Sequence, residues 1–250
     1  MLKLLRRLLI LTAVILFVCV GSILNTGWAR YRRAIEEMPL KTAVDAVRAS
    51  RNYVPFDQID RDYVNAVVAV EDKRFFSRSG FDYAALARAM INNFRQGKAI
   101  EGGSTIPQQT AKNLYFIGRG KTRGVPEKVA EVFLMYDMEE QYTKQDILAL
   151  YAALNYYGDG YWGLDHASRG YYGVPSSDLT IAQSAMLAGI PNAPSVYQLS
   201  SGYDLALSRQ RRVLSNMRRE GYLSEEDYQE ALNEDVHARS GEESSDALLQ

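Results

Sequence analysis

One glutamate in this 250-residue chain belongs to a row of apolar residues whose spacing places them on one face of a helix, and we expect this face to be buried. Glu71 ends a stripe whose other members are valines: Val64, Val67 and Val68. Burial disfavours the charged form of a carboxyl group, which suits a general acid or base working near neutral pH. Glu71 is therefore a candidate catalytic group. The alternative is a helix-end glutamate that pairs at the surface with Lys73 or Arg74.

A second glutamate repeats this arrangement beside a group of cations. Glu131 shares a helical face with Leu134, Met135 and Met138. Basic residues gather just before it: Arg119, Lys121, Arg123 and Lys128. Such a cluster binds phosphate groups and stabilises negative charge that develops in a reaction. The alternative is a solvated charged loop, which is the usual role of such runs.

A pair of glycines at 102–103 leads into a predicted helix that runs through Tyr115. Thr105 and Gln108 have the spacing of a capping box at its start. The free N–H groups and positive dipole end of such a helix bind anions. Lys112 lies one turn beyond Gln108 on the same face. Many ordinary helix N-termini share this pattern, so the anion site is a hypothesis.

The segment from Ile147 to Gly173 is dense in tyrosine and glycine. Aromatic faces flanked by glycine line sugar sites, but aromatic side chains also fill ordinary cores. Both roles stay open from the composition alone.

The elements that must position these residues are predicted to be helices. Spacing and capping signals predict one helix around Glu71 and others at 82–94, 105–115, 127–142, 144–154, 179–189, 205–220 and 224–232. No strand-rich region, repeat or flexible linker interrupts them, so we expect one mainly α domain. The expected boundaries are an N-terminus with its anchor at 1–29, a connector at 30–52, the domain at 53–233 and a polar tail at 234–250.

The first 29 residues form a separate unit. An uncharged stretch from Leu8 to Ala29 follows three basic residues: Lys3, Arg6 and Arg7. About 20 apolar residues cross a bilayer core of about 30 Å, so the stretch predicts a transmembrane helix. Trp28 and Tyr31 are placed as interfacial anchors. Three arginines also follow the span, at positions 30, 32 and 33, but the leading cations together with the terminal amine predict a cytoplasmic N-terminus. A cleaved signal peptide is the alternative.

The composition argues against two classes of function. Without residues 1–29 the chain carries 26 Lys and Arg against 30 Asp and Glu, a net charge of −4. A nucleic-acid-binding domain normally has a basic excess, so we expect no nucleic-acid partner. Two histidines and one cysteine, without metal-ligand spacing, argue against a zinc site.

The order and spacing of these segments resemble the peptidoglycan glycosyltransferases, a lysozyme-like family that polymerises lipid II and includes monofunctional biosynthetic transglycosylases. The family motifs are E-D-x-x-F-x-x-H-x-G, G-x-S-T-I-x-Q-Q, R-K-x-x-E and a Tyr/Gly-rich stretch. The matching residues are Glu71, Asp72, Phe75 and Gly80; Gly102, Ser104, Thr105, Ile106, Gln108 and Gln109; Lys128 and Glu131; and Ile147, Leu148, Tyr151, Gly158, Gly160 and Gly163. The resemblance covers about residues 53–232.

Four positions depart from the family pattern. They are Arg78 in place of His, Glu127 in place of Arg, Ala153 in place of Asn and Gln183 in place of Glu. Arg78 can still donate hydrogen bonds to a phosphate or a carboxylate, and we expect it to replace the family His as a polar strut. Glu127 reverses a charge beside the expected pyrophosphate, and Arg123 is the residue expected to compensate. Both candidate glutamates are retained.

The resemblance implies a two-lobed, lysozyme-like helical domain behind one transmembrane helix. It implies a single-pass protein of the inner membrane with its domain on the periplasmic, outer face. The implied substrates are lipid II and a lipid-linked growing glycan strand, joined by a β-1,4 link with inversion and release of lipid pyrophosphate. Penicillin-binding proteins and proteins of the divisome or elongation machinery are the implied partners. The implied cofactor is a divalent cation, Mg or Mn.

The resemblance also implies a role for each site residue. Glu71 takes the proton of the acceptor 4-hydroxyl, and Glu131 organises the basic groups or the divalent ion near the leaving pyrophosphate. Substrate-binding roles fall on Asp72, Phe75, Arg78, Gly102, Ser104, Thr105, Gln108, Gln109, Lys112, Asn113, Arg123, Lys128 and Tyr151.

Two rival functions stay open. A membrane-anchored hydrolase of lysozyme type also uses paired carboxylates, but it needs neither the basic cluster nor the anchor. A scaffold that keeps the fold and recruits synthases is the non-enzymatic rival, and the four departures are its support. A measurement of lipid II turnover distinguishes the glycosyltransferase from both rival functions.

Overall fold

The computed structural model describes residues 2–78, 104–117 and 124–238. Within these residues the chain is helical and forms no strand beyond one isolated bridge between Tyr156 and Trp162. The mainly α fold is therefore confirmed. The predicted helix at 82–94 lies outside the described residues.

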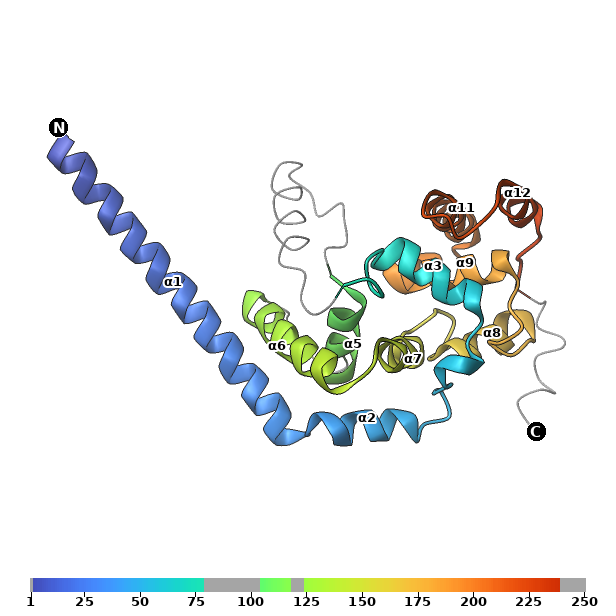
Figure 1. Cartoon of the computed structure of the whole chain (residues 1–250), viewed down its shortest axis with the longest axis horizontal. Helices are drawn as coiled ribbons and strands as arrows, with labels where there is room; N and C mark the ends of the chain where they lie inside the picture. The colour runs from blue at the N-terminus through green and yellow to red at the C-terminus, as the bar shows by residue number, and fades with distance from the viewer. Residues whose placement is uncertain (1, 79–103, 118–123, 239–250) are drawn as a thin grey trace.

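The first helix, α1 (Leu2–Glu37), projects from the domain and has its apolar residues exposed (Figure 1). It is long and apolar enough to cross a membrane, with a mean hydropathy of 2.6 over its most apolar window. The helix continues for eight residues beyond the predicted anchor boundary at Ala29.

The segment predicted as a connector is largely helical. It contains the end of α1 and the whole of α2 (Leu40–Arg48), which begins after Pro39 without a side-chain cap. Three residues of α2 are buried in the core: Leu40, Ala43 and Val44. The segment therefore packs as part of the domain and does not hang as a free tether.

The last turns of α1 pack against α6 (Val125–Gln141). Gly27 makes the close approach possible, since a Cβ there would lie 2.4 Å from Cγ1 of Val129. Next to it, the rings of Trp28 and Tyr31 contact Phe133, with centroid distances of 5.0 and 5.4 Å. These contacts join the predicted membrane anchor directly to the helix that carries Glu131.

The helices α5 (Ile106–Tyr115), α6 and α7 (Lys144–Leu154) form one group (Figure 1). Thr105 caps α5 as predicted, by accepting a hydrogen bond from the N–H of Gln108, and Thr143 caps α7 through Asp146. Asp146 also pairs with Arg48 at 2.6 Å, which ties α2 to α7. Local capping signals thus explain why these helices begin where they do.

The second group consists of α3, α9, α11 and α12 (Figure 1). Their bounds are Arg61–Glu71, Ile181–Gly189, Tyr203–Arg219 and Glu225–Asn233. Asp60 caps α3 and also accepts a hydrogen bond from Ser184 of α9 at 3.1 Å. Two groups of helices agree with the two-lobed domain that the resemblance implies.

Shorter elements lie between these helices along the chain. They are the 3₁₀ turns Phe56–Gln58 and Ile190–Asn192 and the helices α8 (Leu164–Tyr172) and α10 (Pro194–Tyr197). Helix α8 lies inside the Tyr/Gly-rich segment, where no helix was predicted. Its N-cap is Gly163 at φ 83°, a left-handed conformation that favours glycine, and it has no side-chain cap. The local signal for a helix start was therefore missing.

A buried ion network fixes the loop that follows α3. One guanidinium nitrogen of Arg78 lies 2.7 and 2.6 Å from the two oxygens of Asp72, and the other lies 3.2 Å from Glu139 of α6. Lys144 also pairs with Glu139, at 2.6 Å, and Asp72 accepts the N–H of Ile106 at 3.3 Å. Arg78 thus acts as an internal strut between α3, α5 and α6.

We predict that Arg78→Ala destabilises the fold strongly. The substitution leaves Asp72 partly buried and without its ion-pair partner, which costs about 3 kcal/mol of unfolding free energy. The check is denaturant unfolding of the full chain in detergent micelles. Arg78→His, which keeps a hydrogen-bond donor, is expected to recover part of the stability and most of the activity. The exposed Arg51→Ala is the matched control, and equal stability of the Arg78→Ala and Arg51→Ala variants would disprove the strut.

Candidate active site

Glu71 is the last residue of α3, and its side chain is only 9% exposed. Its Oε2 accepts a hydrogen bond from Nε2 of Gln109 at 2.6 Å, and its Oε1 lies 3.5 Å from a guanidinium nitrogen of Arg209. Lys73, one of the alternative surface partners, pairs with Glu220 at 2.5 Å. The inward orientation predicted from the valine stripe is therefore confirmed.

Gln109 connects Glu71 to the start of α5. Thr105 caps the first turn of this helix, and the side chain of Gln109 extends from that turn to Glu71 of α3. The same Nε2 lies 3.5 Å from the backbone oxygen of Ser104. The predicted helix cap thus places an amide donor against the candidate catalytic carboxylate.

Glu131 lies on α6 with its side chain fully buried. Nζ of Lys128, one turn earlier, donates to Oε2 of Glu131 at 2.7 Å and to Oγ of Ser104 at 3.2 Å. The Lys128 side chain is 51% exposed, so its ammonium group joins the buried carboxylate to the solvent-facing side of the site.

These contacts form a polar chain between the two glutamates, joined at Ser104 through its backbone oxygen on one side and its hydroxyl on the other. It runs from Glu71 through Gln109, Ser104 and Lys128 to Glu131. The chain places a carboxylate that can take a proton near a cation that can stabilise negative charge. Residues from three predicted motifs therefore meet in one place, as acid–base chemistry at a charged leaving group requires.

Glu127, the family departure expected beside the pyrophosphate, is turned toward the anchor helix. Its carboxylate is bound by Arg30 of α1 and accepts the N–H of Gly124 at 3.0 Å. Partial burial alone would raise its pKa, but hydrogen bonds from the N–H groups of Glu127 and Gly124 and the charge of Arg30 bring the pKa below its ordinary value. The reversed charge is thus neutralised within the fold. Arg123, expected to compensate for it, lies outside the described residues.

The other predicted binding residues have different surroundings. Phe75, Gln108 and Tyr151 are buried, the first and last of them completely, so they pack in the core. Burial raises the pKa of Tyr151 well above its ordinary value, and the charge of Glu71 adds to this shift. Asn113 donates to Asn155 at 2.8 Å and links α5 to the end of α7.

Asp72 and Arg78 bind each other, so neither projects freely toward a substrate in this structure. Lys112 lies in the last turns of α5. Gly102 lies outside the described residues, as do three of the four basic residues before Glu131: Arg119, Lys121 and Arg123.

Arg209 is the site residue that the sequence reasoning missed. It lies on α11 with its side chain 12% exposed, on the same helical face as Ala206 and Val213. A charged residue on an apolar stripe was the signal used for Glu71 and Glu131. The same test applied to residues 203–219 finds Arg209.

The carboxylates of the site do not fit a resident divalent cation within the described part of the chain. There, no three His, Cys, Asp or Glu side chains converge to hold a metal. Glu131 is already bound to Lys128. A divalent ion needs several oxygen ligands, so no step below uses one.

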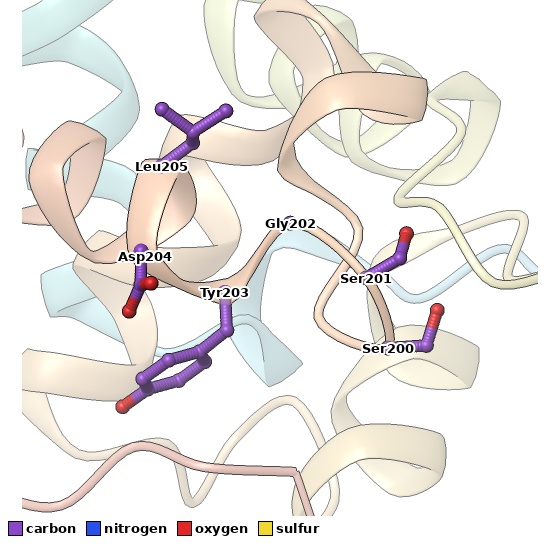
Figure 2. A pocket seen from close by; sticks show the side chains of 6 residues that line it. All are labelled: Ser200, Ser201, Gly202, Tyr203, Asp204 and Leu205. Carbon is purple, nitrogen blue, oxygen red and sulfur yellow. The ribbon is translucent and has the colours of Figure 1, made fainter.

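A surface pocket lies at the loop before α11 and at its first turn (Figure 2). It is lined by Ser200, Ser201, Gly202, Tyr203, Asp204 and Leu205. None of these is a predicted site residue, and the pocket holds a single carboxylate. It is separate from the polar chain between the glutamates.

Comparison with known proteins finds the Transglycosylase family over residues 37–218. A protein of Cupriavidus necator named "Putative transglycosylase" is 38% identical over 206 residues, 82% of this chain and 87% of its own. Penicillin-binding protein 1A of Aquifex aeolicus is 38% identical over 183 residues, 73% of this chain and 25% of its own.

The chain thus spans about a quarter of the length of that penicillin-binding protein. A crystal structure of penicillin-binding protein 1A from Haemophilus influenzae aligns with 53% of this chain and 16% of its own at 25% identity, with a TM-score of 0.36. That score is too low to compare folds. The family match covers most of the described domain and includes Glu71, Gln109, Lys128 and Glu131. This chain therefore belongs to the peptidoglycan transglycosylase family.

Proposed function

We propose that this chain polymerises lipid II into the glycan strands of peptidoglycan. The acceptor 4-hydroxyl loses its proton to Glu71 as its oxygen attacks the anomeric carbon of the donor. The bond from that carbon to the lipid pyrophosphate breaks, and the new β-1,4 link forms with inversion. The observation that carries this proposal is the polar chain joining Glu71 to Lys128 and Glu131.

Glu71 has the properties of a general base. Its carboxylate is largely shielded from water, and each oxygen has a donor, Gln109 on one side and Arg209 on the other. A positioned base of this kind contributes about 10² to 10⁴ in rate. The valines along its helix hold the carboxylate in place by packing.

Lys128 is suited to the leaving group. Its side chain is half exposed, so its ammonium group can contact an incoming pyrophosphate while buried Glu131 fixes its position. Negative charge grows on the pyrophosphate as the glycosidic bond breaks, and a pre-placed cation lowers the energy of that state. Lys112 and Arg123 are the further cations that we propose for this role.

The apolar helix α1 supports a site of action at the membrane. We propose the inner membrane, with the domain on its periplasmic face, because the leading cations favour a cytoplasmic N-terminus. Penicillin-binding proteins and other divisome or elongation proteins are the partners that this location suggests.

The four departures from the family pattern have structural explanations in this fold, which supports the enzyme over the scaffold alternative. Arg78 and Glu127 have charged partners. Gln183 completes a capping box with Thr180, a role that Gln and Glu share. Ala153 is packed in the core. Each departure is accommodated structurally, and none removes a member of the polar chain.

Glu71→Gln is predicted to lower polymerisation by about 10² to 10⁴-fold, because the amide cannot take the proton. The amide is nearly isosteric, so folding and lipid II binding are expected to persist. The measurement supplies purified lipid II to the full chain and separates the products by size. Long strands made by this variant at the wild-type rate would refute the base role.

Glu131→Gln is predicted to be impaired less than Glu71→Gln, because Lys128 keeps its charge but loses its anionic partner. The same product analysis applies. Wild-type protein is expected to consume lipid II and lengthen strands. A hydrolase would instead shorten pre-made strands, and binding without any turnover would favour the scaffold.

Deletion of residues 1–22 is predicted to slow polymerisation in bilayers on the order of 100-fold, since the anchor raises the local concentration of the site at the lipid surface. This deletion keeps Gly27, Trp28 and Tyr31, which pack on α6. Replacement of residues 1–22 by an unrelated apolar helix of equal length is the control and is expected to restore the rate. Unchanged activity of the deletion would contradict the role of the anchor.

A further inference from the structure

Arg209 is a cation that the fold brings to Glu71 from the opposite end of the domain sequence. Its guanidinium nitrogen lies 3.5 Å from Oε1 of Glu71. The side chain is 12% exposed, and buried neighbours on the same helical face hold it inside: Ala206, Val213 and Met217. Burial of a cation is costly unless it meets an anion, so this contact requires an explanation.

The absence of a side chain at Gly189 leaves space for the aliphatic part of the Arg209 side chain, which extends toward Glu71. A Cβ at Gly189 would lie 2.9 Å from Cγ of Arg209, closer than two carbon atoms approach without displacement. The backbone of Gly189 has φ −78°, which any residue adopts, so glycine is not needed there for conformation. The close contact with the aliphatic part of the Arg209 side chain therefore explains why position 189 is a glycine.

Among the residues that the structure describes, no carboxylate other than Glu71 pairs with the guanidinium of Arg209. Glu71 is the acid with which it pairs, and its buried Nε has no acceptor among the described residues. Gln109 holds the second oxygen of Glu71 at 2.6 Å. The two donors therefore bracket the carboxylate from α5 and α11.

We propose that Arg209 is a positioning residue that holds the Glu71 carboxylate oriented for proton transfer. This inference rests on the proposed function, because it explains what prepares Glu71 to act as the general base. Arg209 acts through Glu71 and is not itself placed on a reacting atom.

Three other titratable side chains lie near Glu71 in the fold or in the sequence, two tyrosines and one aspartate. Tyr151 of α7 and Tyr63 of α3 are completely buried. Burial raises the pKa of both tyrosines far above the ordinary value, and the charge of Glu71 adds to each shift. Asp72 is bound by Arg78. The guanidinium of Arg209 is therefore the cation that contacts the Glu71 carboxylate from α11.

The test compares Arg209→Gln, which removes the charge, with Arg209→Lys, which retains it. Activity on lipid II is measured against pH with the full chain in bilayers. For Arg209→Gln we expect the acidic limb of the kcat profile to move to higher pH by about one unit. At a fixed pH on that limb, kcat is then about tenfold lower than in wild type. KM is expected to change little. Arg209→Lys is expected to restore most of the limb. Arg212→Ala, an exposed arginine on the same helix, is the matched control and leaves the limb in place.

A folded Arg209→Gln variant whose acidic limb coincides with that of wild type would overturn the inference. If wild type makes no glycan at all, the proposed function fails, and the inference is decided by titration alone. The full chain is then labelled with ¹³C at glutamate carboxyl groups, and the Glu71 signal is identified by its loss in Glu71→Gln. A midpoint about one pH unit higher in Arg209→Gln supports the inference, and an unchanged midpoint overturns it.

Gly189→Ala is a second variant that leaves Arg209 in the sequence. It is expected to fold well, since alanine suits a helix better than glycine does. The added methyl group displaces the Arg209 stem, so the acidic limb and the carbon-13 midpoint are expected to shift in the same direction as in Arg209→Gln. An unshifted limb and midpoint in both variants would leave Arg209 a merely structural residue and overturn the proposal.

Discussion

The side-chain amide of Gln109 is the contact that joins the separate parts of the site. It lies 2.6 Å from Glu71 of α3 and 3.5 Å from the backbone of Ser104, whose hydroxyl is next to Lys128 of α6. Polar groups shielded from water must keep their hydrogen-bond partners. Gln109 therefore ties α3 to the start of α5, and Lys128 of α6 adds a more exposed contact at the same serine.

The same rule governs the charges outside the polar chain. Arg78 brings together Asp72 and Glu139, and Glu127 is neutralised by Arg30. A charge inside a protein is stable only with a partner of opposite sign. The two charged positions that depart from the family pattern, Arg78 and Glu127, thus have partners of opposite sign within this fold, and Glu71 and Lys128 are retained.

The docking of α1 on α6 connects membrane position to chemistry. The contacts of Gly27 and Trp28 lie on the helix that carries Lys128 and Glu131. An anchor that packs directly on this helix limits how the site can turn relative to the lipid surface. That constraint suits a substrate whose lipid stays in the bilayer while its sugar reacts.

The sequence by itself determined the mainly α fold, the anchor, the starts of α5 and α7 and the inward face of Glu71, because caps and stripes act between residues at most four positions apart. It did not predict α2 or α8, whose starts lack side-chain caps. The contact of Arg209 with Glu71 spans 138 positions. Only the tertiary structure decided it, because the packing of α11 against α3 and α9, across the bare backbone of Gly189, brings the two charges together.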